Sequence, residues 1–120
     1  MSGTSADAID TALVGFESDG TTHLICTHTL QLPADLKKRI IAAQTRADTT
    51  IRDVCEQDVA LSLLYAVAVE TLTKKANIPA SKIEAIGNHG QTLLHAPEAD
   101  HPFTLQIGDN HRLAELSGIT

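Results

Sequence analysis

The sequence predicts an α/β fold, in which a mixed sheet carries helices packed against it. Segments in which apolar residues alternate with polar ones, typical of strands, occur near residues 9–17, 23–32 and 103–107. Two segments with apolar residues at helical spacing follow Pro33 and Thr50. Since the 120 residues contain no low-complexity linker, we expect a single domain.

Composition and charge exclude several kinds of partner. The formal net charge is -6 at pH 7, whereas nucleic acids and anionic membranes attract clusters of Lys and Arg. No apolar run is long enough to cross a bilayer. Cys26 and Cys55 lack the spacing of a redox or zinc motif, so we expect reduced, buried thiols. We therefore expect a cytoplasmic protein with neither a nucleic-acid nor a membrane partner.

The first half of the chain is expected to form a hairpin and then a helix. Ile9 to Glu17 is the first predicted strand, and Asp19-Gly20 is typical of the turn that follows. His23 to Leu32 is the returning strand, in which Leu24, Cys26, His28 and Leu30 alternate onto one face. Pro33 occupies the first helical position of a helix that places Leu36, Ile40 and Ala43 on one stripe. The adjacent basic cluster Lys37 to Arg39 is interpreted as a solvated helix face.

A second, longer helix is predicted from Ile51 to Ala76. Thr50 and Asp53 form a capping pair before it, and Asn77-Ile78-Pro79 ends it. Its main apolar stripe comprises Leu61, Leu64, Tyr65, Ala68, Leu72 and Ala76. Leu63 and Val67 are apolar on another side, which predicts burial against more than one neighbour. The carboxylates of Glu56, Asp58 and Glu70 are interpreted as helix surface rather than as a catalytic pair.

The second half is expected to contain short strands and a final helix. Ile83 to Gly87 is a predicted strand, and Asn88 to Thr92 is its exit turn. Thr92 to His95 and Phe103 to Ile107 are further strands, separated by a polar loop from Ala96 to Pro102. Asp109 or Asn110 is expected to cap a helix from His111 to Leu116, with Gly118 as its stop.

The opening segment has the residue types of a phosphate-binding turn. Small residues around Gly3 let a ligand approach the backbone, and amides exposed in such a turn bind anions. Ser2, Thr4 and Ser5 add hydroxyl groups, while the carboxylates of Asp7 and Asp10 suit Mg²⁺. No Lys follows at the spacing of a P-loop. A Ser/Gly-rich start without any ligand is the alternative interpretation.

The segment His89-Gly90-Gln91-Thr92 is a second candidate site. Gly90 permits a backbone conformation that projects His89, Gln91 and Thr92 into a cleft, where they can hold the polar groups of a sugar. A purely structural turn is the alternative. Asp109 is either a helix cap or a further ligand contact. His89, His95 and His101 do not match a zinc pattern, so no metal site is assigned to them.

Three ordered blocks of the sequence resemble the anhydro-N-acetylmuramic acid kinase family. The blocks are Met1 to Asp10, Ile86 to Thr92, and Pro102 to Asp109, and the segment Ala114 to Thr120 also fits. The resemblance implies part of the N-terminal lobe of an actin-like ATPase fold, shared by actin, Hsp70 and sugar kinases. It assigns the first block to the phosphates of ATP, with the residues Gly3, Thr4, Ser5, Ala6, Asp7, Ala8, Ile9 and Asp10. It places His89, Gln91, Thr92 and Asp109 on the sugar side of the cleft.

The implied reaction uses ATP, Mg²⁺ and water to convert 1,6-anhydro-N-acetylmuramic acid to N-acetylmuramic acid 6-phosphate in peptidoglycan recycling. The resemblance covers about the first third of a full kinase, whose second lobe and catalytic aspartate are expected beyond Thr120. No catalytic residue is therefore assigned within this chain, and the isolated fragment is expected to be inactive. A homodimer is expected for the full-length form.

Two rival interpretations remain: a non-catalytic sugar- or nucleotide-binding module, and a dimerisation fragment that uses the long helix. The opening block departs from the family pattern in two places. Ala8 replaces a glycine and Ala6 replaces a bulky residue, and Ala8 would strain a turn that required a positive φ.

Overall fold

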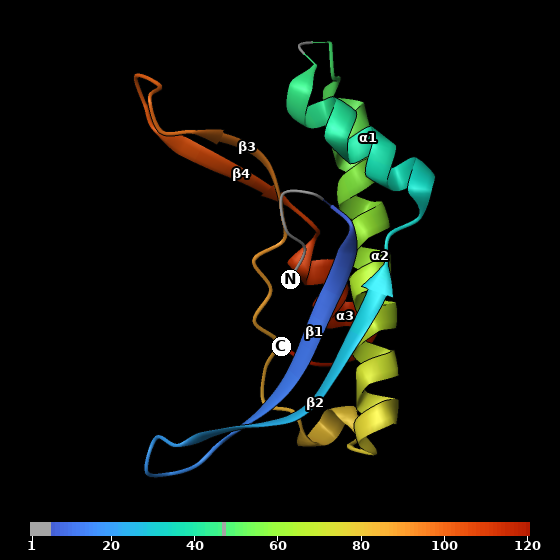
Figure 1. Cartoon of the computed structure of the whole chain (residues 1–120), viewed down its shortest axis with the longest axis vertical. Helices are drawn as coiled ribbons and strands as arrows, with labels where there is room; N and C mark the ends of the chain where they lie inside the picture. The colour runs from blue at the N-terminus through green and yellow to red at the C-terminus, as the bar shows by residue number, and fades with distance from the viewer. Residues whose placement is uncertain (1–5, 47) are drawn as a thin grey trace.

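The computed structural model describes residues 6–46 and 48–120. In chain order its elements are β1 (Ala8–Phe16), β2 (Thr22–Gln31), α1 (Ala34–Thr45), α2 (Ile51–Ala76), a short 3-10 helix (Ala80–Lys82), β3 (Gln91–Ala96), β4 (Phe103–Ile107) and α3 (Asn110–Ser117). Figure 1 shows α2 running the length of the molecule, with the β1–β2 hairpin against its lower half and the β3–β4 hairpin projecting near its other end. The predicted α/β class is confirmed as a small mixed domain.

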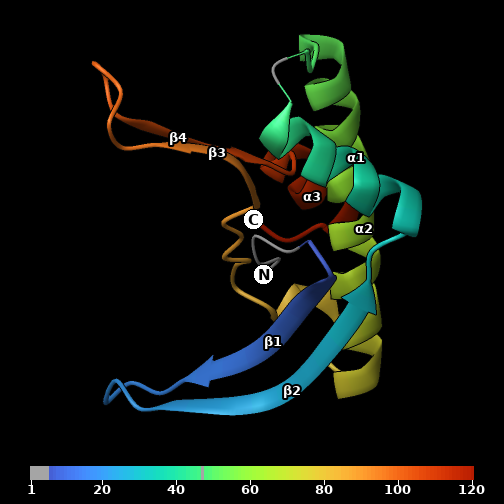
Figure 2. The same cartoon turned by 45° about the horizontal axis from the view of Figure 1, so that its top comes forward.

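The strands form two sheets instead of one. Both sheets are two-stranded and antiparallel, with β1 beside β2 and β3 beside β4, and Figure 2 shows the two hairpins as separate arms. The prediction of one mixed sheet is therefore wrong for the described residues. The predicted strand Ile83 to Gly87 is also wrong, because this segment has no ladder with a neighbouring strand. Its Ile86 N–H donates instead to the Thr120 carbonyl at 2.7 Å.

The β1–β2 hairpin lies close to its predicted limits and packs one face on α2. Ile9 is almost fully buried on that face, opposite Leu30. The register shifts between Leu13 and Val14, so that Leu24 pairs with Val14 and is 64% exposed. The extra residue turns Leu24 away from the face of Cys26, because a β-bulge reverses the alternation beyond it. The prediction that Leu24 shares that face is therefore wrong.

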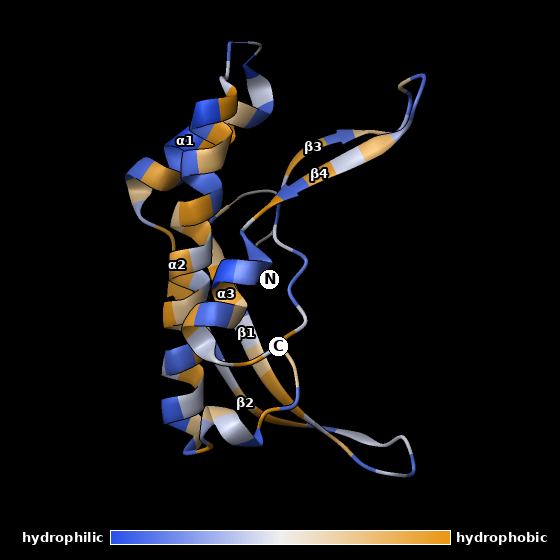
Figure 3. Ribbon diagram, turned by 180° about the vertical axis from the view of Figure 1, so that it is seen from behind, coloured by the Kyte–Doolittle hydropathy of each residue, from blue (hydrophilic) through white to orange (hydrophobic). Residues whose placement is uncertain are grey.

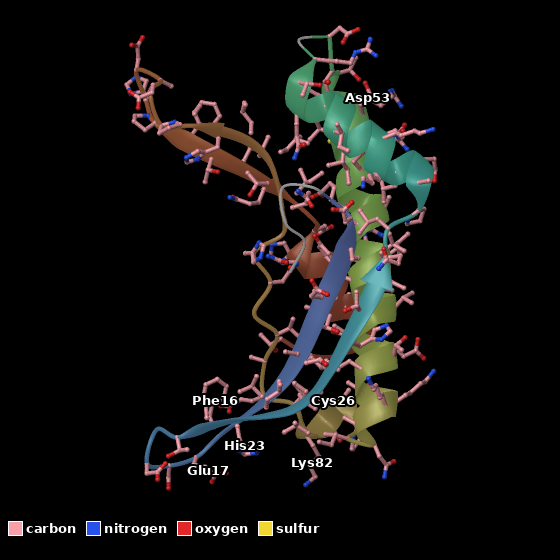
Figure 4. The ribbon with its side chains drawn as sticks, in the orientation of Figure 1. Phe16, Glu17, His23, Cys26, Asp53 and Lys82 are labelled. Carbon is pink, nitrogen blue, oxygen red and sulfur yellow. The ribbon has the colours of Figure 1, made fainter. Side chains whose placement is uncertain are left out.

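The far end of this hairpin is polar and tightly turned. Gly20 has a φ of 86° and donates from its N–H to the Glu17 carbonyl at 3.0 Å, as the predicted Asp-Gly turn requires. His23 Nδ1 lies 3.5 Å from the Glu17 carboxylate. Figure 4 labels these two residues beside Phe16 at the lower end of the hairpin.

Helix α1 begins one residue later than predicted. Pro33 is the N-cap and not the first helical residue, since its ψ of 137° is extended. The Pro33 carbonyl still accepts the first helical hydrogen bond, from the Lys37 N–H at 3.0 Å. Leu36 and Ile40 are buried as the apolar stripe predicts, and Ala43 is half-buried.

Helix α2 has the predicted limits and the predicted cap. The Thr50 hydroxyl accepts from the Asp53 N–H, and the Asp53 carboxylate accepts from the Thr50 N–H, which makes a complete capping box. The helix ends at Asn77, whose φ of 54° is left-handed. Local sequence signals thus determine both ends of the longest element.

The core lies where the other elements meet α2. Leu61, Tyr65, Ala68 and Leu72 are buried along one stripe of the helix, which contacts β1, β2, β4, α1 and α3. Figure 3 shows hydrophobic residues recurring along α2 and along β1.

Leu63 and Val67 do not join this core. They are 46% and 47% exposed, so this second side of α2 is only partly covered. The prediction that α2 packs against more than one neighbour is confirmed, because the helix contacts β1, β2, β4, α1 and α3.

The thiols are less buried than predicted. Cys26 is half-buried and Cys55 is exposed, and both are free. Their reduced state agrees with the prediction, but their burial does not. Across residues 6–46 and 48–120, no helix combines the length and the apolarity that crossing a bilayer needs.

Candidate functional site

Two predicted site turns lie side by side at one end of the β3–β4 hairpin. Gln91 pairs with Ile107 at the start of the ladder, so Gly90 and Gly108 stand on either side of the same strand end. Gly90 has a φ of 70°, and a Cβ there would lie 2.6 Å from the Ile107 carbonyl oxygen. A glycine is therefore required at position 90 by both conformation and space.

The exit turn is shorter than predicted. It comprises Asn88 to Gly90, because Gln91 and Thr92 already belong to β3. The Gly90 N–H donates to Oδ1 of Asn88 at 3.1 Å, which closes the turn. His89 is exposed at its apex, whereas Gln91 is fully buried and Thr92 is half-buried.

The Thr92 carbonyl anchors the residues after the turn to α1. Nε2 of Gln91 donates to the Thr92 carbonyl at 3.3 Å. The same carbonyl accepts from Nε2 of Gln44, on α1, at 2.8 Å. The His89 imidazole is thus exposed on a turn whose backbone is held by these hydrogen bonds.

Asn88 and Asn110 connect the two turns directly. Nδ2 of Asn88 donates to Oδ1 of Asn110 at 2.7 Å, and Nδ2 of Asn110 lies 3.5 Å from the Asn88 carbonyl oxygen. These two residues immediately precede His89 and follow Asp109 in the sequence.

Asp58 holds the second turn from the helix side. Its Oδ1 accepts a hydrogen bond from the Gly108 N–H at 2.7 Å, across 50 residues of chain. Glu56 and Glu70 make surface ion pairs with Arg39 and Lys74, as the helix-surface interpretation predicts. Asp58 differs from them, since it supports a loop that carries a candidate site residue.

Asp109 caps α3. Its Oδ1 accepts from the Arg112 N–H at 3.0 Å, and its other oxygen lies 3.6 Å from Nε of Arg112. The hydrogen bond from the Arg112 backbone, followed by that from His111, lowers the pKa of the Asp109 carboxyl below its usual value. The residue is therefore ionised in the neutral range. The cap is confirmed, and a contact with substrate stays a prediction.

The predicted phosphate site lies partly outside the described residues. Gly3, Thr4 and Ser5 are not described, whereas Ala6 to Asp10 are. Ala6 is fully buried and has a φ of 49°. Ala8 begins β1 without a positive φ, so the strain considered for Ala8 is not present. The unusual backbone conformation falls two residues earlier, at Ala6.

Both carboxylates of the opening block have partners in the structure. Asp7 is exposed and forms an ion pair with Lys37 of α1. Asp10 is exposed and accepts from the Thr29 hydroxyl at 2.7 Å, across the β1–β2 ladder. Lys37 thus brings a positive charge to the base of the opening block, which is more than the solvated-face interpretation of its cluster predicts. Ile9 contributes its side chain to the core and has only its backbone available to a ligand.

A cavity of about 530 Å³ lies between β1 and the segment 83–88. Ile9 and Asp10 line it on one side, and Gly87 and Asn88 on the other. The remaining lining is mainly apolar, and His89, Gln91, Thr92 and Asp109 are not part of it. The opening block and the exit turn are thus neighbours across one cavity, and the predicted sugar contacts stand outside it.

The described residues contain no group of three His, Cys, Asp or Glu side chains arranged to hold a metal ion. A Mg²⁺ carried by a nucleotide needs fewer protein ligands, since this ion retains several waters. The Asp7 and Asp10 carboxylates are ligands of the type that Mg²⁺ prefers, and Lys37 contacts Asp7.

Sequence reasoning missed the supporting residues Lys37, Asp58, Asn88 and Asn110. Each acts through a contact that links segments at least 22 residues apart. Lys37 and Asp58 were interpreted as helix surface, and Asn110 was considered only as an alternative cap for α3.

The comparisons with known proteins agree with each other. The family model for anhydro-N-acetylmuramic acid kinase matches residues 1–120. The chain is 49% identical over 120 residues to the anhydro-N-acetylmuramic acid kinase of Coxiella burnetii (strain Dugway 5J108-111), covering all of this chain and 32% of the relative. It is 40% identical over 119 residues to the enzyme of that name from Vibrio vulnificus (strain CMCP6), covering 99% of this chain and 32% of the relative. The chain thus spans about a third of the length of these relatives.

Proposed function

Because the chain belongs to the anhydro-N-acetylmuramic acid kinase family, we propose that it forms the N-terminal part of an ATP-dependent kinase of peptidoglycan recycling. Its reaction would open 1,6-anhydro-N-acetylmuramic acid with water and yield N-acetylmuramic acid 6-phosphate. The observation that carries the proposal is the family match along residues 1–120. The position of the opening block and the exit turn on either side of one cavity supports it.

The opening block would hold the phosphates of ATP. The amides and hydroxyls of Gly3, Thr4 and Ser5 would face the phosphate oxygens, with Asp7 and Asp10 directed at the accompanying Mg²⁺. Lys37 would keep the Asp7 carboxylate in place. When bound, Mg²⁺ supplies charge neutralisation for phosphoryl transfer, a reaction that depends mainly on positioning and electrostatics.

The second pair of turns would hold the sugar. His89 is exposed at a supported apex and offers ring nitrogens to a hydroxyl, carboxylate or acetamido group. The ionised Asp109 lies on the adjacent turn and would accept hydrogen bonds from hydroxyls of the sugar. Gln91 and Thr92 would act mainly by fixing this backbone, given the burial of Gln91. We assign the activation of water to none of the described residues.

The test is a chimera in which this chain replaces the aligned 120 residues of the Coxiella burnetii relative. With ATP, Mg²⁺ and the anhydro-sugar, the chimera should release ADP and form the 6-phosphate, whereas the 120-residue chain alone should not. A folded chimera that binds sugar or nucleotide without turnover would favour the non-catalytic binding module. Turnover by the isolated chain, free of contaminating kinase, would contradict the proposed division of the site between two parts.

Two substitutions in the chimera separate the two turns. His89→Ala should lower kcat/KM for the anhydro-sugar by about ten- to thousandfold, with little change in ATP affinity measured without sugar. Gly3→Val should raise the KM for ATP and leave sugar binding without nucleotide nearly constant.

The matched control is His95→Ala, which removes an exposed histidine from the same hairpin. It should change neither kcat/KM for the anhydro-sugar nor the affinity for ATP. Equal losses for ATP and sugar in the His89 variant, with a lower melting temperature, would identify His89 as a packing residue. Unchanged ATP kinetics in a folded Gly3 variant would exclude the opening turn as the phosphate site.

A further inference from the structure

Asn88 and Asn110 join the two turns through a side-chain to side-chain hydrogen bond. The bond from Nδ2 of Asn88 to Oδ1 of Asn110 is 2.7 Å long. The second amide group of the pair points back, with Nδ2 of Asn110 3.5 Å from the Asn88 carbonyl oxygen. The Asn88 side chain thus donates to the Asn110 side chain, 22 residues away in sequence, and the Asn110 amide faces the Asn88 backbone carbonyl.

Each member of the pair is also bound to its own turn. Oδ1 of Asn88 accepts from the Gly90 N–H at 3.1 Å, so the side chain that reaches across also closes the turn that carries His89. Asn110 is the first residue of α3 and follows the Asp109 cap. The Gly108 N–H is held by Asp58 at 2.7 Å. The second turn is therefore anchored to α2. The Asn88–Asn110 pair links the first turn to the second turn.

The Asn88–Asn110 pair contributes little to the stability of the fold. Asn110 is exposed and Asn88 is half-buried, and hydrogen bonds between partly solvated neutral groups contribute little net free energy. The pair instead fixes the distance between His89 and Asp109, because these residues are the immediate neighbours of the two asparagines.

We propose that the Asn88–Asn110 pair is a positioning latch, which sets the separation at which His89 and Asp109 meet the sugar. The inference rests on the proposed function for its ligand. Asn88 and Asn110 are positioning residues that touch no reacting group. Loss of the latch leaves both turns folded and lets the His89 apex move relative to Asp109.

The first measurement needs no activity. In the 120-residue chain, Asn110→Ala should speed hydrogen exchange at the Gly90 N–H by about threefold or more, because Asn88 loses the partner that orients it. Asn88→Asp is the rescue variant: one carboxylate oxygen accepts from Gly90, and the Asn110 amide rotates to donate to the other. Its Gly90 exchange should stay near that of the parent chain. Unchanged exchange in Asn110→Ala would overturn the latch.

The second measurement uses the chimera. Asn88→Ala and Asn110→Ala should each lower kcat/KM for the anhydro-sugar by about three- to tenfold. The KM for ATP and the melting temperature of Asn110→Ala should stay at parental values. The double variant should lose no more than the worse single variant, because both substitutions break one contact, and Asn88→Asp should retain parental kinetics.

The outcomes separate the two proposals. An inactive parent chimera would reject the proposed function and, with it, the sugar-positioning role of the pair. An active parent whose Asn110→Ala variant keeps full kcat/KM would reject the latch alone. Additive losses in the double variant, or a fall in melting temperature matching the kinetic loss, would show two separate structural roles and would also overturn the latch.

Discussion

Cε2 of Tyr65 occupies the space in which a side chain at Gly108 would begin. A Cβ built on Gly108 would lie 2.4 Å from that ring carbon, and the φ of Gly108 is 116°. Tyr65 is itself buried in α2. The end of β4 thus approaches α2 as closely as a chain without a side chain allows, which places the Asp109 turn against the central helix.

Gly108→Ala should therefore be strongly destabilising. The positive φ and the clash with Tyr65 together should lower the free energy of unfolding by about 2–4 kcal/mol, measured by urea denaturation. Gly118→Ala is the matched control, since its φ is 69° and no atom lies within 4 Å of the added Cβ. It should cost only about 1 kcal/mol. Equal losses of unfolding free energy in the two variants would mean that a small shift of the Tyr65 ring relieves the clash.

The two sides of α2 should respond differently to truncation. Leu61 is fully buried, so Leu61→Ala should lower the free energy of unfolding by about 2–5 kcal/mol. Leu63 is 46% exposed, and Leu63→Ala should cost less than about 1 kcal/mol. A large loss for Leu63 that grows with protein concentration would reveal a second copy covering that side.

The capping box of α2 is a further test. Thr50→Ala removes the acceptor for the Asp53 N–H and should cost about 1 kcal/mol in thermal or urea unfolding. The control is Thr71→Ala, because the Thr71 hydroxyl donates only to the Val67 carbonyl one turn earlier in the same helix. Ala is the better helix former there, so this change should be neutral or slightly stabilising. A similar loss for both variants would argue against a specific role of the cap.

Asp109 gives a pH dependence with a defined sign. Its folded pKa is lowered, chiefly by the hydrogen bond from the Arg112 backbone, so the unfolded chain binds the proton more tightly. The stabilisation is fully present above the unfolded pKa of about 3.9 and is lost as the pH falls through the lowered folded pKa.

Asp109→Asn isolates this effect, because Asn retains a capping oxygen but does not titrate. Urea unfolding from about pH 7 to about pH 3 should show the parent losing its advantage over the variant at the acid end. Asp19, Asp48 and Asp53 also have lowered pKa values and titrate in both proteins. A difference between parent and variant that does not change with pH would exclude the ionised cap.

Local signals in the sequence were sufficient for the helices and the first hairpin. The limits of α2 are encoded by Thr50 with Asp53 at one end and by Asn77 at the other, all within a few residues of the ends that they determine. The Asp19-Gly20 turn and the alternation on either side determine the β1–β2 hairpin in the same way. Such elements depend on neighbours in sequence, which a sequence displays directly.

The segment Ile83 to Gly87 failed as a prediction because a strand is defined by its neighbours in space. Its apolar residues favour a strand, but its backbone N–H groups of Ile83 and Ile86 donate to the carbonyls of Ala80 and Thr120 and not to a neighbouring strand. The exposure of Leu63 and Val67 has the same origin, since an apolar residue is buried only where another element covers it.

The turns that carry the candidate site residues were predicted from the sequence, whereas the residues that support these turns were missed. Gly90 and Asp109 are recognisable by residue type, as a turn former and a helix cap. The contact of Asp58 with Gly108 joins positions 50 residues apart, and a carboxylate on a helix is usually solvated. The partner of such a residue is determined by the fold and not by its own type.

The central position of α2 has a consequence for how the molecule opens. The two sheets are separate, yet β1, β2 and β4 all contact this one helix. Neither hairpin can keep its buried face once α2 is lost, because a two-stranded sheet is marginal without a packing surface. Amide protons near Leu61 and Tyr65 should therefore exchange only through global unfolding, while those at the hairpin ends exchange through local opening. The proposed phosphate and sugar regions are thus joined into one cooperative unit by a helix that carries no predicted ligand contact.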